Sequence, residues 1–317
     1  MATVRESGLA PTAGTVVEDI GMGPYQVKEL FLSYSVTFAD GAELLLISSA
    51  ARAVAVDWSL SATQRGSLVS IVFFGVLIGN LLGGLCSDGL GRRLPVLISY
   101  ASVGIFSIIS AFSTGFWSLA FWRLLVGLAF GIGGPPAIIY ALEIAPPHWR
   151  TFMTCMGQSL FVVGEAYSAC LIGLDDPSMQ NLNWRWLLVA GALPCALLFS
   201  AAVPFLNESP SWLALHGKEE DARETLSKMG KMNGSSRASF DVGTPPVKET
   251  RDKGFKGLMR HAHIILGPTM LYSTLVSCLN CFCANFAYYG GIYAFAQLFS
   301  GDVSTGTSPS FALLMGC

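Results

Sequence analysis

The stretch GGLCSDGLGRRLPV, residues 83–96, separates two long apolar runs. It is rich in glycine, and it carries one aspartate and two adjacent arginines, Asp88, Arg92 and Arg93. Glycine suits a tight turn because it adopts backbone conformations that other residues avoid. What the charged side chains do in this turn depends on what the flanking apolar runs are.

Composition indicates that the flanking runs are membrane helices. The chain has 317 residues, of which 52% are hydrophobic and 13% are charged, whereas soluble domains are about 25% charged. These values predict an all-α integral membrane protein with several spans. The net charge of −2 gives no basic field that would attract nucleic acid. Residues 1–27 contain no apolar core, so a cleaved signal peptide is not expected.

Apolar runs of about 20 residues predict seven spans. They fall near residues 30–51, 66–87, 94–142 (two spans, with a break near 113–115), 152–174, 186–206 and 264–301. The last run has no polar turn, so one helix that bends at Gly290-Gly291 is favoured over a hairpin of two short helices. The expected organisation is an N-terminal segment 1–27, a six-helix bundle 28–206, a linker 207–263, a seventh helix 264–301 and a tail 302–317.

The distribution of basic residues predicts the orientation. With the N-terminus in the cytoplasm, 15 of the 19 Lys and Arg residues lie on the cytoplasmic side and three on the outer side. Short loops rich in Lys and Arg stay in the cytoplasm. The N-terminus and the linker are therefore expected there, in a multi-pass protein of the plasma membrane or of an intracellular vesicle.

Four charged residues fall within the predicted spans: Asp40, Glu43, Arg123 and Glu165. A charge at the centre of a bilayer costs about 3 kcal/mol on insertion scales, so these side chains should face the bundle interior. Asp40 and Glu43 share a helix face and raise each other's proton affinity. With Arg123 as the counter-charge, they favour proton-coupled transport. The alternative is an ion pair that only fixes helix register, and Glu165 could instead reach an interface.

Other patterns indicate packing rather than chemistry. Glycines recur every four residues, at 75, 79 and 83 and again at 127 and 131, which favours close contact between helices. Cys278, Cys281 and Cys283 cannot all face one ion from a single helix, so no metal site is predicted, and no cofactor is expected. All four histidines lie on the predicted cytoplasmic side, and an enzyme is not expected.

The opening turn then becomes recognisable. Its pattern G-x3-D-x2-G-R-R, from Gly84 to Arg93, resembles the loop signature of the major facilitator superfamily. RLLVGLAFGIGG at 123–134, the E-x2-P-x3-R pattern that starts at Glu143, and NWRWL at 183–187 are similar to its sugar-porter and organic-ion branches. NESPSWLALHGKEEDARETL resembles the segment after their sixth helix, although Asn207 and Ser211 depart from it. TVVEDIGMGPYQVKELFL, FADGAELL and FAYYGG look like the synaptic-vesicle-two-related transporters.

The resemblance implies twelve helices in two bundles, of which this chain holds the first bundle and about one helix of the second. SPSFALLMGC at 308–317 is too short to span, so the chain is expected to be C-terminally truncated. The implied function is secondary active transport of a small organic solute, an organic ion or a sugar-like compound, by alternating access and symport with protons. A non-transporting binding or regulatory relative, or an inactive fragment, is the alternative.

The resemblance also assigns roles to individual residues. Asp40 would bind the proton, Arg123 would be its switch partner, and Glu43 would be a second acid in contact with a cationic solute. Three residues of the last helix would line the cavity: Asn285, Tyr288 and Tyr289. Eight would form the cytoplasmic gate: Gly84, Asp88, Gly91, Arg92, Arg93, Glu143, Arg150 and Glu208.

Overall fold

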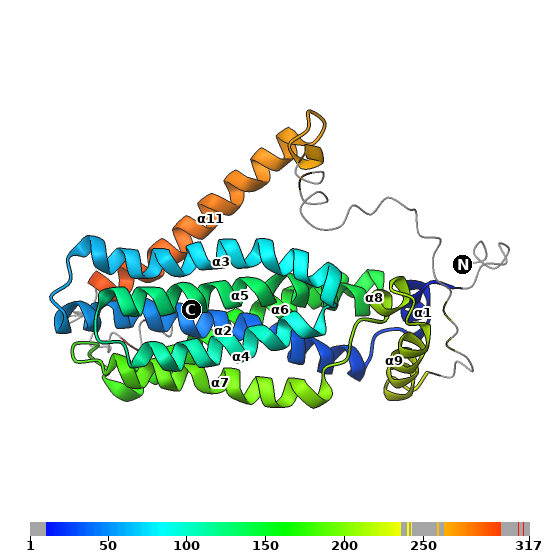
Figure 1. Ribbon diagram of the computed structural model, residues 1–317, viewed down its shortest axis with the longest axis horizontal. Coiled ribbons are helices and arrows are strands. Elements are labelled where there is room, and N and C mark those ends of the chain that lie inside the picture. The colour runs from blue at the N-terminus through cyan, green and yellow to red at the C-terminus, as the bar shows by residue number, and fades with distance from the viewer. Residues whose placement is uncertain are drawn as a thin grey trace.

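Six long helices form an elongated bundle in the computed structural model (Figure 1). The structure describes residues 11–235, 240, 242, 259, 263–298, 310 and 313. The bundle helices are α2 (Pro24–Asp57), α3 (Ala62–Leu90), α4 (Arg93–Ala111), α5 (Phe116–Ile144), α6 (Arg150–Asp175) and α7 (Trp184–Phe205). By length and composition all six can cross a membrane, the fifth of them counted from Pro147 so that the 3-10 turn Pro147–Trp149 is included.

Local sequence signals set where these helices begin and end. Pro24 is the first residue of α2, a position where its missing N–H costs nothing. Ser61 caps α3, because its hydroxyl accepts from the Gln64 N–H at 3.2 Å while the Gln64 side chain accepts from the Ser61 N–H at 3.0 Å. The break predicted near residues 113–115 is the turn between α4 and α5.

Glycines bring two pairs of helices into backbone contact. On α3 and α5, Gly79 faces Gly131, where a Cβ atom built on Gly131 would lie 2.6 Å from the Cα atom of Gly79. On α2 and α6, Gly41 packs on the backbone of Phe161, and Gly164 packs on the backbone of Phe38. These contacts place the charged positions of α2, α5 and α6 inside one bundle.

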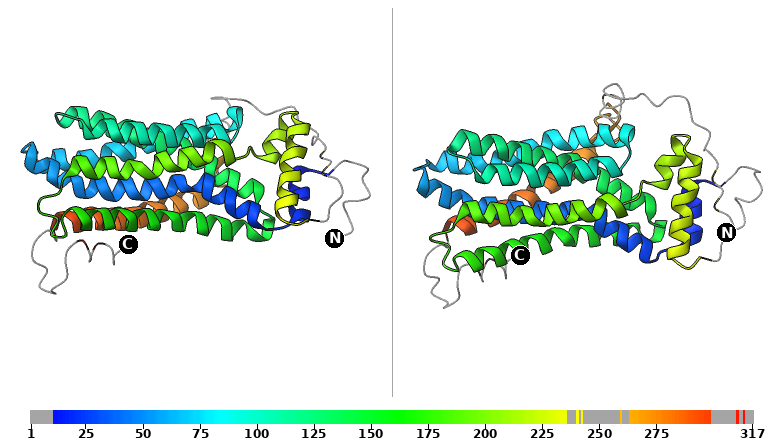
Figure 2. Two further views of the ribbon diagram at one scale, coloured as in Figure 1. Left: turned by 90° about the horizontal axis from the view of Figure 1, so that it is seen from below. Right: turned by 60° about the horizontal axis from the view of Figure 1, so that its bottom comes forward.

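Three short helices cover one end of the bundle, which we call the α9 end (Figure 2). They are α1 (Ala13–Ile20), α8 (Pro210–Leu215) and α9 (Glu219–Met232). Asn233, just after α9, holds the start of α2: its Oδ1 accepts from the Tyr25 N–H at 3.0 Å, and its Nδ2 donates to the Gly21 carbonyl at 3.2 Å and to Gln26 Oε1 at 2.8 Å. The first part of the predicted linker is thus docked on the bundle.

The last described helix, α11 (Leu271–Leu298), runs obliquely along the bundle and meets it near its C-terminal end (Figure 1). It is one helix rather than a hairpin, and it starts later than the predicted residue 264. Ile264 and Gly267 form a separate turn, with the Gly267 N–H donating to the Ile264 carbonyl at 3.2 Å, and Pro268 cannot continue a helical hydrogen-bond ladder.

Candidate functional site

The charged network inside the bundle joins α2, α4 and α5. Arg123 Nη1 donates to Glu43 Oε2 at 2.6 Å, and its Nη2 donates to the hydroxyls of Ser107, at 3.2 Å, and Ser110. The Ser107 hydroxyl donates to the other oxygen of Glu43. Arg123 is 1% exposed and Glu43 2%. The two charges cancel, and three helices share the hydrogen bonds.

This geometry differs from the predicted pairing of Arg123 with Asp40. Arg123 pairs with Glu43, and no ion pair to Asp40 occurs among the described residues. Three residues advance a helix by about 4.5 Å, so Glu43 lies almost one turn beyond Asp40. That step brings Glu43, and not Asp40, to the guanidinium.

Asp40 instead lies beside Glu165 of α6, and the two carboxyls interact electrostatically. Asp40 is partly buried, and its Oδ1 is inaccessible and has no hydrogen-bond partner within residues 11–235 and 263–298. Glu165 is fully buried; one oxygen accepts a hydrogen bond from the Tyr288 hydroxyl of α11, and Oε1 has no partner in the same ranges. Two carboxyls with unused acceptors therefore face α11.

Aromatic rings surround these acids. The ring of Tyr288 lies 5.3 Å from that of Tyr289 and 6.3 Å from that of Phe161, and Tyr289 is also 4.9 Å from Phe73 of α3. Of the three α11 residues predicted to line the cavity, Tyr288 and Tyr289 thus reach the bundle. Asn285 is exposed, and its side chain donates to the Cys281 carbonyl of its own helix at 2.7 Å.

The α3–α4 turn forms a second polar cluster at the α9 end. Arg92 is 5% exposed and donates to Glu143 of α5 through two of its three guanidinium nitrogens, Nη2 to Oε1 at 3.0 Å and Nε to Oε2 at 3.3 Å. Asp88 lies 3.7 Å from Arg92, and its side chain is 65% exposed. Because an exposed ion pair contributes little, Glu143 is the main partner of Arg92.

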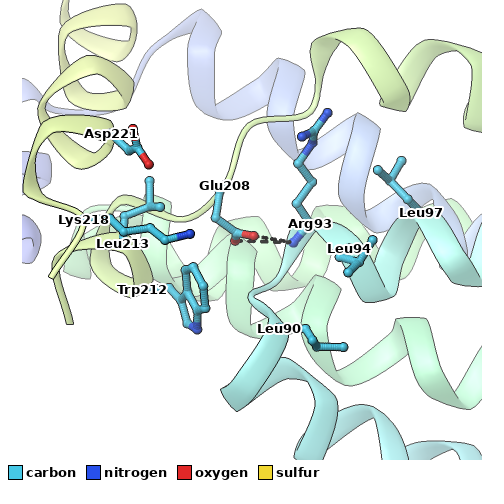
Figure 3. Close-up of a pocket in the computed structure, with 9 residues that line it drawn as sticks. All are labelled: Leu90, Arg93, Leu94, Leu97, Glu208, Trp212, Leu213, Lys218 and Asp221. Atoms are coloured by element: carbon cyan, nitrogen blue, oxygen red, sulfur yellow. Dashed lines mark hydrogen bonds between the residues drawn. The ribbon is translucent and has the colours of Figure 1, made fainter. Parts of the chain in front are cut away.

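Glu208 ties the segment after α7 to this turn (Figure 3). One of its oxygens accepts from the Arg92 N–H at 2.8 Å, and both accept from the Arg93 N–H at 3.3 Å. Gly91 has a φ of +94° and lies against this carboxylate, so a side chain there would be strained and would collide with it. Burial raises the pKa of Glu208, and the backbone N–H donors oppose that shift.

The remaining predicted gate residues, Arg93, Gly84 and Arg150, form no ion pair with the acids of this cluster. The Arg93 guanidinium donates to the Val203 carbonyl at 2.6 Å rather than to an acid. Gly84 has open space where a side chain would be. Arg150 is exposed, with no side-chain hydrogen bond or ion pair to the described residues.

Sequence reasoning missed two groups of polar residues. Ser107 and Ser110 complete the Arg123 network, and their only signal is a three-residue spacing within an apolar span. Glu29 is fully buried and accepts from the Tyr140 hydroxyl at 2.7 Å and from Asn207 Nδ2 at 2.6 Å, while the adjacent Lys28 lies 2.8 Å away. A lone Glu at the start of an apolar run gives no hint of partners more than 100 residues away.

Similarity to curated proteins points to membrane transporters. The chain is 30% identical over 312 residues to organic cation/carnitine transporter 7 of Arabidopsis thaliana, covering 88% of this chain and 60% of that protein. It is 31% identical over 303 residues to the synaptic vesicle 2-related protein of Bos taurus, covering 95% of this chain and 53% of that protein. The chain thus spans little more than half the length of these relatives.

Solved structures show the same fold. A crystal structure of a D-xylose-proton symporter matches with a TM-score of 0.60 and 19% identity, covering 92% of this chain and 64% of that one. The partially occluded, inward-open xylose transporter XylE from E. coli matches with a TM-score of 0.59 and 22% identity, covering 67% and 56%. The six-helix bundle followed by α11 is therefore the N-terminal bundle of a major facilitator fold and the start of the next.

The sequence signature, the bundle and these similarities agree with the family match. Residues 23–314 match the family described as sugar (and other) transporter. The chain belongs to this family of transporters within the major facilitator superfamily.

Proposed function

We propose that the protein is a secondary active transporter that moves a small organic solute together with protons. The observation that carries this proposal is the state of Asp40, whose inaccessible Oδ1 has no hydrogen-bond partner in the described bundle. The nearest basic side chain of the network, Arg123, is occupied by Glu43. A carboxyl without a counter-charge inside a membrane protein is costly when ionised, so in this arrangement Asp40 is suited to carry a proton.

Coupling requires a second arrangement in which Asp40 gives up its proton. Glu43 and Asp40 lie on one helix, so a shift of α2 relative to α5 by about one turn would exchange their positions at Arg123. Arg123 beside Asp40 would favour the ionised carboxyl. The proton would then be bound in one conformation and released in the other.

The α9 end supplies a contact that such a cycle would break and remake. Glu143 and Glu208 hold the α3–α4 turn to α5 and to the segment after α7. Opening this end to solvent would separate these groups, and closing it would restore them. We place this end in the cytoplasm, in the plasma membrane or a vesicle membrane, as the basic residues predict.

The names of similar proteins support a small organic solute as the substrate but do not identify which one. The names organic cation/carnitine transporter 7 and D-xylose-proton symporter place an organic ion, a sugar and protons among the substrates of similar proteins. In transporters of this architecture the solute lies between the two bundles. We propose the same location here, on the face of the first bundle that meets α11.

Transport in proteoliposomes tests this function, with a form of the protein that spans the length of its relatives. Asp40→Asn should abolish accumulation of solute driven by an imposed pH gradient, while solute exchange without a gradient persists in part. Glu220→Gln, an exposed acid on α9, is the matched control and should behave as wild type. If Asp40→Asn still concentrates solute under the gradient, Asp40 is not the coupling acid. If no form moves any solute, a binding or regulatory role replaces transport.

A further inference from the structure

We infer that Glu29 is a positioning residue for the proposed proton coupling, because its buried contacts hold α2 at the level that keeps Asp40 away from Arg123. This inference rests on the proposed function and concerns the regulation of the same site. Glu29 lies about 21 Å from Glu43 along α2, at about 1.5 Å per residue. It therefore acts on the position of the helix rather than on the solute or the proton.

The contacts of Glu29 join α2 to two other parts of the bundle. Its Oε2 accepts from the Tyr140 hydroxyl of α5 at 2.7 Å and from the Asn207 N–H at 3.2 Å. Its Oε1 accepts from Asn207 Nδ2 at 2.6 Å and lies 2.8 Å from Lys28 Nζ, which also donates to the Phe205 carbonyl at 3.1 Å. Both carboxylate oxygens are satisfied and Glu29 is fully buried. Moving α2 away from these donors would leave a buried charge with fewer partners.

The spacing of polar residues on α2 relates Glu29 to the coupling acid. Asp40 precedes Glu43 by three residues, and Gln26, also fully buried, precedes Glu29 by the same step. A shift of α2 by three residues, about 4.5 Å along its axis with a turn of about 60°, would bring Asp40 to Arg123. The same shift would bring Gln26 to the place of Glu29, where its amide oxygen can accept from the donors there. One movement thus exchanges both pairs.

The present hydrogen bonds of Gln26 oppose this shift as well. Its Oε1 accepts from Asn233 Nδ2 at 2.8 Å and from the Gly23 N–H at 3.1 Å, and its Nε2 donates to the Gly21 carbonyl at 3.0 Å. The shift would break the bond to Asn233 and release the start of α2 from the segment after α9. The attachment of α9 and the contacts of Glu29 therefore hold α2 at the same level.

Glycine contacts show where the bundle can move. Backbone contacts at glycines join α2 to α6 and α3 to α5. Between α2 and α5, Gly133 instead meets a side chain, because its Cβ position lies 3.4 Å from a methyl carbon of Val36. A shift of α2 together with α6 along α5 therefore leaves both joined pairs intact.

The charge of Glu29 is what favours the described arrangement. The shift carries position 29 away from the α9 end and toward the middle of the bundle, where an ionised side chain is costly. A glutamine at this position has nearly the same shape and still forms hydrogen bonds, but it carries no charge. Glu29→Gln should therefore raise the population of the shifted arrangement, in which Asp40 meets Arg123.

Distances between spin labels on α2 and α5 test the shift in the purified chain in lipid nanodiscs. One label replaces Phe31, 46% exposed near the start of α2, and the other replaces Trp117, 80% exposed at the start of α5. A non-canonical amino acid carries each label, so the native cysteines stay in place. The sites lie toward opposite ends of the bundle, so the shift shortens their distance by up to about 4.5 Å. Pulsed electron paramagnetic resonance should show the shorter distance about tenfold more populated in Glu29→Gln than in wild type.

Further variants separate positioning from a general loosening of the helices. Without an acid at position 40 the shift gains no ion pair with Arg123. Asp40→Asn added to Glu29→Gln should therefore reduce the population of the shorter distance by about tenfold or more, whereas a loosened bundle would keep it raised. Asn207→Ala removes one donor to Glu29 and should raise that population by less than Glu29→Gln does. Glu220→Gln, exposed on α9, should leave the distances unchanged.

The outcomes distinguish this inference from the proposed function, because the distances require no transport. Unchanged distances in Glu29→Gln, or a shorter distance that persists when Asp40→Asn is added, would overturn the positioning role. If Glu29→Gln does not fold, Asn207→Ala decides the point in the same way. Loss of pH-driven accumulation in Asp40→Asn without any change of distance in Glu29→Gln would leave coupling standing and remove the positioning role. A shift in Glu29→Gln without transport of any solute would do the reverse.

Discussion

At the scale of single residues, the acids inside the bundle differ in whether their carboxyl oxygens have partners. Glu43 is neutralised by Arg123 and held by Ser107, whereas Asp40 and Glu165 keep unused oxygens. In the first arrangement, removing one partner leaves the other charge buried without compensation. The second favours exchange of protons and ligands.

This contrast predicts opposite effects of two conservative substitutions. Glu43→Gln should lower the free energy of unfolding by about 3–5 kcal/mol, because Arg123 then carries an uncompensated buried charge. Asp40→Asn should leave stability close to that of wild type, since Asp40 forms no ion pair in the described bundle. Thermal unfolding of the detergent-solubilised protein measures both, and equal midpoints for the two variants would contradict the assignment.

The sequence identified these residues but not their partners. Charges within apolar spans had to face the interior, which gave Asp40, Glu43, Arg123 and Glu165. Which acid meets Arg123 depends on helix rotation and vertical offset, and these are set by contacts between distant segments. A one-turn difference, invisible in the pattern, was enough to replace Asp40 with Glu43.

At the scale of elements, the glycines of α3 and α5 explain why these helices touch along their length. A Cβ atom at Gly131 would lie 2.6 Å from both the Asn80 backbone nitrogen and the Gly79 Cα atom. At Gly134, one turn on, the nearest atom would be the Asn80 side-chain oxygen at 3.8 Å. Two glycines of the same helix therefore have different structural roles.

Alanine at each position should separate these roles. Gly131→Ala should destabilise the protein by about 1–3 kcal/mol, because backbone atoms of α3 cannot move aside cheaply. Gly134→Ala should cost less than Gly131→Ala, because no backbone atom of α3 lies within 4 Å of its Cβ position. Alanine should bring no gain over glycine there, because the following Pro135 disfavours a helical residue that has a Cβ atom. Thermal unfolding again gives the comparison. A larger loss for Gly134→Ala than for Gly131→Ala would show that the α3–α5 contact is not the close one described.

At the scale of the whole molecule, apolar run lengths and the glycine-rich turn were enough to predict the six-helix bundle. The docking of α8 and α9 on the bundle was not predicted. The bond from Asn207 to Glu29 spans 178 positions in sequence, and no local periodicity encodes such a pair. A helix, Leu271–Leu298, lies within the range expected for the seventh span. Its oblique course depends on packing against α2, α3 and α6.

The orientation of the molecule gives a direct prediction. The positive-inside rule predicts that 15 of the 19 Lys and Arg residues share the cytoplasmic side with the N-terminus and the linker. An epitope tag after Met1 and another after Ser235 should both be recognised by antibodies only after cells are permeabilised. Recognition of either tag on intact cells would reverse the topology, or show that the two segments lie on opposite sides.

The attachment of α9 to α2 affects the chemical stability of one side chain, that of Asn233. Asn233 is followed by Gly234, and an Asn-Gly sequence deamidates readily because the glycine nitrogen can attack the side-chain amide and expel ammonia. Here three hydrogen bonds to Gly21, Tyr25 and Gln26 hold that amide. The reaction needs the amide to be released, and its product, an aspartate or isoaspartate, lacks the two donations to Gly21 and Gln26. The rate of deamidation at position 233 should therefore increase with the fraction of time that α9 is detached from the start of α2.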